Sequence, residues 1–288
     1  MSTRRQRTIA NQVSFSGLGL HTGQEVTIHL SPASENAGVF FRRIDLPEKP
    51  EIAATIQNVQ QTSRSTTIGV GEHCVHTVEH LLAAVSAFNI DNLCIEITAA
   101  ESPISDGSSR EFVTLLEQAG AVEQEAEQEV LRVTEPIYFS EGGIHLVALP
   151  AEEFRVSYTL HYPKVQKIGS QYFSMALSCT NFKEQLCSSR TFALYEEIEA
   201  LKARGLIRGG SLENAVVIKD HVILNEGGLR YEDEMVRHKV LDVIGDLFLV
   251  GRPFFAHVIA ICSGHRTNVK FGEKLMKHFS SYKGDCNG

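Results

Sequence analysis

The feature that most constrains this chain is a helical segment, residues 236–246, in which a polar stripe runs through apolar residues. Residues four apart on a helix lie one turn above each other, so His238, Asp242 and Asp246 share one side. A histidine and a carboxylate at this spacing are two ready ligands for a metal such as zinc. For this segment alone, an ordinary solvated helix face is the simpler interpretation.

A second helical segment, residues 76–85, also holds a histidine beside a carboxylate. When the two segments are superposed, His80 falls on His238, and each helix leads into a strand-like stretch. This match suggests two similar half-chains that each bring one helix to a shared site. We therefore expect a metal ion held by His80, His238 and Asp242. Three protein ligands leave the fourth zinc position open for water, which is typical of a catalytic site.

The length of the chain favours two domains, because 288 residues exceed the usual size of a single hydrophobic core. We place these domains at residues 1–126 and 127–288, with the acidic stretch 123–129 as the linker. Strand-like and helical segments segregate along the chain rather than alternate, and this favours the α+β fold class.

Hydrophobic periodicity predicts the individual elements. Helices are expected at residues 77–88, 110–118, 195–204, 234–250 and 267–278. Strands are expected at residues 12–16, 25–30, 38–42, 52–56, 92–98, 131–139, 144–149, 154–160, 215–218 and 256–261. Three glycines between residues 17 and 23 predict a tight turn or a close approach of the backbone to a ligand.

Charge and cysteine content argue against several classes of protein. A net charge of −8 disfavours nucleic acid as the main partner. No apolar run reaches the roughly 18 residues that span a bilayer, and no apolar signal-peptide core follows the basic N-terminus. The six cysteines form no Cys-x-x-Cys pair, so neither a disulfide framework nor a thiolate zinc site is expected. These features favour a cytoplasmic protein without stable membrane insertion.

Hydrolysis at such a site also needs groups that take and give protons. Glu79 directly precedes His80 on an otherwise apolar helix, so we favour a general base over a surface glutamate. His265 follows directly on the strand expected at residues 256–261. Asp246 could hold His265 as an imidazolium, which would be a general acid for a leaving amine. An ordinary loop histidine is the alternative for His265.

Two further polar residues lie next to the expected site, and each has two interpretations. Lys239 neighbours His238 and could offset negative charge in the transition state, or it could be an ordinary solvent-exposed lysine. Thr191 precedes the helix expected at residues 195–204. Its hydroxyl could donate to an oxyanion, or it could cap that helix, which is the commoner role.

A competing motif uses some of the same residues. Residues 76–80 match the His-x-x-Glu-His pattern of inverted zinc proteases, in which His76 and His80 both bind the metal. The pattern has only three fixed residues, and it leaves the stripe with His238 and Asp242 without a role. We therefore rank a peptide-cleaving protease second. A non-enzymatic module with a structural zinc ion would require four protein ligands.

Taken together, these residues resemble the UDP-3-O-acyl-N-acetylglucosamine deacetylase family, the zinc amidases of lipid A synthesis in Gram-negative bacteria. The resemblance covers nearly the whole chain and is most specific at residues 78–81 and 237–242. Further matching blocks are residues 17–23, 77–97, 103–108, 189–192, 205–210, 224–245 and 263–265. The resemblance implies hydrolysis of the acetamide at C2 of the sugar, with release of acetate and a free amine.

The same resemblance implies a role for each candidate residue. One zinc ion per chain, or an iron(II) ion that accepts the same ligands, would be bound by His80, His238 and Asp242. The catalytic residues would be Glu79 as base, His265 as acid paired with Asp246, and Thr191 and Lys239 as groups that stabilise the transition state. Substrate contacts would be His21, Phe192, Gly210 and again Lys239.

The resemblance further implies two similar β-α-α-β domains with the metal between them. An insert in the second domain, here residues 192–218, would form a hydrophobic passage for the acyl chain, although part of its apolar face could simply pack on the core. The partner would be a UDP-linked acylated amino sugar, and a monomer is expected. Family members do not generally have a histidine at the position of His76, so we expect that His76 is not a ligand.

Overall fold

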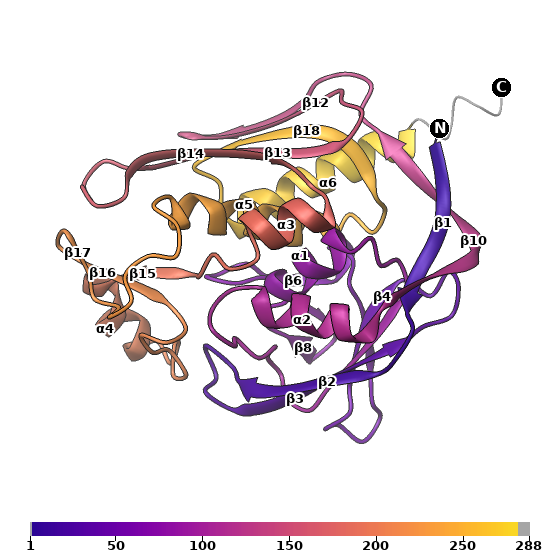
Figure 1. Cartoon of the computed structure of the whole chain (residues 1–288), viewed down its shortest axis with the longest axis horizontal. Coiled ribbons are helices and arrows are strands. Elements are labelled where there is room, and N and C mark those ends of the chain that lie inside the picture. The colour runs from indigo at the N-terminus through magenta and orange to yellow at the C-terminus, as the bar shows by residue number, and fades with distance from the viewer. Residues whose placement is uncertain (1, 282–288) are drawn as a thin grey trace.

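The computed structural model describes residues 2–281, in which most of the helices lie between two sheets (Figure 1). The first-half sheet has the order β2 (Val13–Leu18), β3 (Glu25–Pro32), β9 (Leu93–Ile97), β4 (Val39–Arg43) and β5 (Glu51–Ala53). Its neighbours are antiparallel, except that β4 and β9 are parallel. Strand β3 buries every second side chain, as expected for a strand with one face on the core.

A smaller sheet precedes the first helix of the site. It consists of β6 (Val59–Gln61), β7 (Thr67–Val70) and β8 (His73–Val75), and it follows a short 3-10 helix, η1 (Ile56–Asn58). These elements were not expected from the sequence. The strand expected at residues 52–56 was too long, because β5 ends at Ala53 and η1 begins three residues later.

The second sheet has seven strands, and its strand β18 lies at the centre. Its main order is β1 (Ser2–Ile9), β10 (Ala121–Arg132), β18 (Phe254–Ile261), β12 (Ile144–Leu149) and β11 (Ile137–Glu141). Strand β18 also pairs with β13 (Phe154–Tyr162), and β13 in turn pairs with β14 (Gly169–Ala176). Buried residues alternate with partly exposed ones along the whole of β18. One face of this sheet therefore packs on the core.

The expected linker at residues 123–129 is wrong, because this stretch lies inside β10. Strand β10 pairs antiparallel with β1, and the two run along one side of the molecule, on the right in Figure 1. Arg5 faces Glu127 and Arg7 faces Glu123 in this register. Opposite charges directly across a strand pair stabilise it, so the acidic stretch is compatible with a strand once its basic partner is present.

Helices fill the space between the two sheets. They are α1 (Glu79–Ala87), α2 (Arg110–Ala119), α3 (Cys179–Gln185), α5 (Glu234–Phe248) and α6 (His265–Ser281). Helix α1 of the first half packs directly against α5 of the second. Within the described residues, no helix is long and apolar enough to cross a bilayer.

A separate unit projects from one side of the molecule, at the left in Figure 1. It contains β15 (Phe192–Leu194), α4 (Tyr195–Ala203), β16 (Val216–Lys219) and β17 (Val222–Ile223). Its loop contacts the glycine-rich loop of the first half, because the backbone N–H of Gly209 donates to the carbonyl of Leu20 at 3.0 Å. All five helices expected from the sequence are present, and the mixed α+β class is confirmed.

Candidate metal centre and active site

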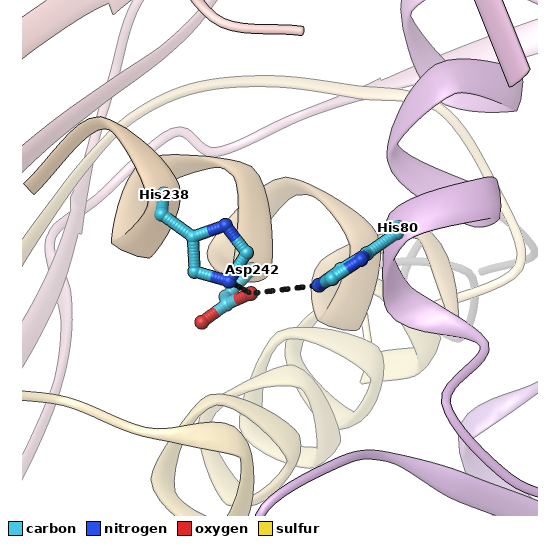
Figure 2. A group of neighbouring side chains, drawn as sticks. All are labelled: His80, His238 and Asp242. Carbon is cyan, nitrogen blue, oxygen red and sulfur yellow. Dashed lines mark ion pairs between the residues drawn. The ribbon is translucent and has the colours of Figure 1, made fainter. Parts of the chain in front are cut away.

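The three expected metal ligands come together between the two central helices. His80 lies in the first turn of α1, and His238 and Asp242 lie one turn apart on α5 (Figure 2). One ligand atom from each residue lies within 4.8 Å of the others. Asp242 Oδ1 is 3.2 Å from His238 Nε2 and 3.9 Å from His80 Nε2. All three side chains are buried.

The protonation states of these residues suit a cation. Burial lowers the pKa of His80 to about 3 and also lowers the pKa of His238, so both rings are neutral, which is the form that binds metals. Burial would raise the pKa of Asp242, but the charges of Lys239 and the His265 imidazolium hold it well below its usual range. The site therefore offers two neutral imidazoles and one carboxylate.

The hydrogen bonds around His238 and Asp242 leave one ring nitrogen and one carboxylate oxygen available to bind a metal ion. His238 Nδ1 lies 3.2 Å from the carbonyl of Ser189, an acceptor, so Nδ1 carries the hydrogen and Nε2 offers its lone pair. Among the described residues, no donor contacts Asp242 Oδ1. A buried carboxylate oxygen without a hydrogen bond is costly unless a cation fills the gap. The donor set of two nitrogens and one oxygen fits zinc.

Glu79 lies beside the metal ligands and is buried with them. Its Oε2 accepts a hydrogen bond from the backbone N–H of Thr66 at 3.0 Å, and its Oε1 is 3.8 Å from His265 Nε2. Burial raises the pKa of Glu79 to about 7. A carboxylate with this pKa can both take and release a proton near neutral pH.

His265 is the first residue of α6, and a carboxylate holds its ring. Its Nδ1 lies 2.9 Å from Asp246 Oδ2, and its Nε2 lies 4.0 Å from Asp242 Oδ2. Burial would lower the pKa of His265, but the carboxylates of Asp246, Glu79 and Asp242 raise it to about 10. His265 is therefore an imidazolium at neutral pH and not an ordinary loop histidine.

Lys239 turns toward the site rather than into solvent. Its Nζ donates to Asp242 Oδ2 at 2.7 Å and lies 5.6 Å from the centroid of the Phe192 ring. Burial would lower the pKa of Lys239, but Asp242 raises it above its usual value. The interpretation of Lys239 as a solvent-exposed side chain is wrong, and its positive charge is available at the site.

Thr191 does not cap the helix that follows it. Leu194 is the N-cap residue of α4, so the capping interpretation of Thr191 is wrong. The backbone N–H of Thr191 donates to the carbonyl of Gly107 at 2.8 Å, and its carbonyl accepts from Val216 at 2.7 Å. These bonds fix the backbone of Thr191 beside the site.

These groups line a single cavity of about 340 Å³. Its lining includes Glu79, His80, His238, Asp242 and His265 with Thr191, Phe192, Lys239 and His21. Neither ring nitrogen of His21 has a partner among the described residues, and burial lowers its pKa. Gly210 does not line this cavity. A carbon at its Cβ position would lie 3.7 Å from the Leu20 side chain.

His76 is separate from the metal group. Its Nδ1 lies 2.9 Å from the Thr67 hydroxyl, and its Nε2 lies 3.5 Å from Cys74 Sγ. The ligand group found among the described residues contains His80 without His76. The pair of histidine ligands that an inverted zinc protease requires is therefore not formed.

Several residues that support the site were not foreseen. Thr66 and Asn268 both donate to Asp246, and Ser189 orients His238. Asn268 could have been found, because it lies three residues after His265 on the same helix. Thr66 gives no such signal, because a partner 180 positions away in the sequence cannot be inferred from local periodicity.

Comparisons with known proteins agree along nearly the whole chain. A family model described as UDP-3-O-acyl N-acetylglycosamine deacetylase matches residues 6–277. The UDP-3-O-acyl-N-acetylglucosamine deacetylase of Chlamydia pneumoniae is 48% identical over 278 residues, which is 96% of this chain and 99% of the relative. The enzyme of the same name from Chlamydia caviae is 46% identical over 277 residues, with the same coverage of both chains.

Proposed function

The chain belongs to the UDP-3-O-acyl-N-acetylglucosamine deacetylase family, and from this premise we propose that its buried histidine–aspartate group performs the deacetylation with a bound zinc ion. The chain is a hydrolase of lipid A biosynthesis that removes the N-acetyl group from UDP-3-O-acyl-N-acetylglucosamine. The observation that carries the proposal is the cavity where three metal-ligand atoms meet a buried carboxylate and a buried imidazolium.

His80, His238 and Asp242 would hold the metal. When bound there, zinc would polarise the amide carbonyl and lower the pKa of water at the site. Iron(II) accepts the same nitrogen and oxygen ligands, so metal analysis of the purified protein decides between them. Either cation would supply the partner that Asp242 Oδ1 lacks among residues 2–281.

Glu79 is the proposed general base. It takes a proton from the water that attacks the acetyl carbonyl carbon, so that the new C–O bond forms without a build-up of free hydroxide. Its pKa of about 7 is close to neutral pH, where a base of this kind is most effective. The backbone N–H of Thr66 holds one oxygen, and the other faces His265.

His265 is the proposed general acid. Its imidazolium gives a proton to the sugar nitrogen as the C–N bond breaks, so the amine leaves as a neutral group rather than as an amide anion. Asp246 holds the ring through Nδ1, which leaves the Nε2 proton for transfer. Acetate and the free amine are the two products.

Lys239 and Thr191 are proposed to stabilise negative charge on the acetyl oxygen. The Lys239 ammonium is held within the site by Asp242, and preorganised donors lower a barrier more than mobile ones. We also propose that His21, Phe192 and Gly210 contact the substrate, a UDP-linked acylated amino sugar. His21 and Phe192 line the cavity. The proposal that Gly210 contacts the substrate rests only on its place in the loop between α4 and β16.

The remaining proposals concern the whole chain. We propose two similar domains, residues 1–126 and 127–288, because each half brings a helix to the site and contributes an outer sheet, although this boundary falls within β10 and β1 of the first half joins the second sheet. Residues 192–218 are proposed as the acyl passage, although Leu201 of α4 is buried and also packs within its own unit. We propose a monomer that works in the cytoplasm.

The ligand assignment predicts different outcomes for substitutions at Asp242 and His76. Asp242→Ala removes a ligand and should lose bound zinc and deacetylase activity, whereas His76→Ala removes a half-buried histidine outside the group and should keep both. The measurements are zinc content after dialysis and release of amine from UDP-3-O-acyl-N-acetylglucosamine. Loss of zinc in His76→Ala with retention in Asp242→Ala would show that the assignment is wrong.

A further inference from the structure

Thr66 lies in the loop before β7 and touches both proton-transfer groups of the site. Its side chain is fully buried. Its backbone N–H donates to Glu79 Oε2 at 3.0 Å, and its hydroxyl donates to Asp246 Oδ1 at 2.5 Å. One residue of the first half therefore contacts the proposed base directly and the carboxylate that holds the proposed acid.

The hydroxyl of Thr66 has a distinct place around Asp246. Asp246 is fully buried, and its Oδ2 accepts from His265 Nδ1 at 2.9 Å and from Asn268 Nδ2 at 2.8 Å. Among the described residues, Thr66 provides the side-chain donor to Oδ1. Without it, this oxygen would lose its hydrogen bond in a buried environment, and the carboxylate would gain by rotating toward the other donors. The ring of His265 would move with it.

We propose that Thr66 is a positioning residue whose hydroxyl fixes Asp246, and through it His265, relative to Glu79. This inference rests on the proposed function, because it assigns Thr66 a part in placing the acid of that reaction. The two bonds of Thr66 come from different parts of the residue. A side-chain substitution therefore releases Asp246 while the backbone N–H still holds Glu79.

The neighbouring residue offers a matched control. Thr67 is also buried, and its hydroxyl bonds to His76 Nδ1 at 2.9 Å, outside the metal group. Thr66→Val and Thr67→Val each replace one buried hydroxyl by a methyl group of the same size. Both remove one side-chain hydrogen bond, but only Thr66→Val affects the bond to Asp246.

We expect Thr66→Val to lower kcat on the order of 10-fold, as is typical for residues that orient the ligands or catalytic groups of a metal site. KM and zinc content should stay at the wild-type values, and Thr66→Ser should restore kcat because it keeps the hydroxyl. Thr67→Val should have wild-type kcat. Equal losses in Thr66→Val and Thr67→Val, or no rescue by serine, would mean that Thr66 is merely structural.

A double substitution tests whether Thr66 acts through His265. In a His265→Ala background the acid is already absent, so adding Thr66→Val should cause no further loss of kcat. A second loss of the same size in that background would overturn the inference. If Thr66→Val does not fold, Thr66→Ala and Thr66→Ser carry the same comparison.

The same measurements separate this inference from the function on which it rests. If His265→Ala alone keeps full deacetylase activity, the proposed acid is wrong. If His265→Ala lowers kcat while Thr66→Val has wild-type kcat, His265 remains the proposed acid and the proposed role of Thr66 is wrong.

Discussion

Glu79 and His265 occupy the same buried site, yet their surroundings drive their pKa values apart. Burial raises the pKa of Glu79 to about 7. Burial would lower the pKa of His265, but Asp246 and the other nearby carboxylates raise it to about 10. Between these values Glu79 is ionised and His265 is protonated. Two titratable groups whose environments separate their pKa values in this way are a signature of paired base and acid roles.

The pH dependence of kcat/KM follows from these two groups. Activity should rise with pH as Glu79 loses its proton, through a pKa of about 7, and should fall as His265 loses its proton, through a pKa of about 10. A bound cation favours the carboxylate and disfavours the imidazolium, so both limbs should lie at lower pH in the zinc enzyme.

Glu79→Gln tests the assignment of the lower limb. Glutamine keeps the shape but cannot take the proton, so kcat should fall on the order of 100-fold or more, and the residual activity should lack the acid limb. The control is zinc content at each pH, because protonation of the histidine ligands would also lower activity in acid. A Glu79→Gln enzyme with wild-type kcat would exclude Glu79 as the base.

At the scale of elements, the contact between α1 and α5 sets the distance between the two sets of ligands. Gly245 makes this contact possible, because a Cβ atom there would lie only 2.1 Å from the carbonyl oxygen of Glu79. Glu79 and His80 stand in the first turn of α1, at that same contact. Any side chain at residue 245 would push α1, with the proposed base Glu79 and the proposed ligand His80, away from α5.

Gly245→Ala should therefore destabilise the protein by about 1–3 kcal/mol, the usual cost of overpacking, and should also weaken zinc binding. Alanine favours a helix over glycine by only about 1 kcal/mol, which does not offset the clash. Gly272→Ala on α6 is the control, because its Cβ would meet the end of the Ile56 side chain, which can move. Denaturant unfolding and zinc titration measure both effects. Wild-type zinc affinity in Gly245→Ala would contradict this account.

The elements also explain which parts of the molecule could be predicted from sequence. The stripe on α5 has helical spacing, so His238 and Asp242 could be paired without knowledge of the fold. Strand β1 lacks alternating apolar residues, so periodicity does not predict it, and residues 123–129 of its partner β10 have the charged composition of a linker. It pairs with residues distant in the sequence, where Arg5 lies opposite Glu127, and local periodicity gives no sign of such a partner. Thr66 was missed for the same reason, because its contact with Asp246 is tertiary.

At the scale of the whole molecule, the site belongs to neither half alone. Glu79 and His80 come from the first half, and the other proposed metal ligands and the proposed acid come from the second. Strand β1 adds a second connection, because it pairs with β10, and its Arg4 forms an ion pair with Asp91 at 2.6 Å. The halves must therefore stay docked for the metal ligands to remain together.

Metal binding should consequently stabilise both halves as one unit. A ligand that binds only the folded state stabilises it by about 2.7 kcal/mol at 100 times its Kd. We expect the metal-free protein to unfold in a single cooperative transition. Zinc at that excess should raise the free energy of unfolding by about 2.7 kcal/mol, and chelation should reverse this increase. Asp242→Ala should unfold at the same point with and without zinc. Two separate transitions, of which zinc moves only one, would show that the halves fold independently and that the ligand set does not join them.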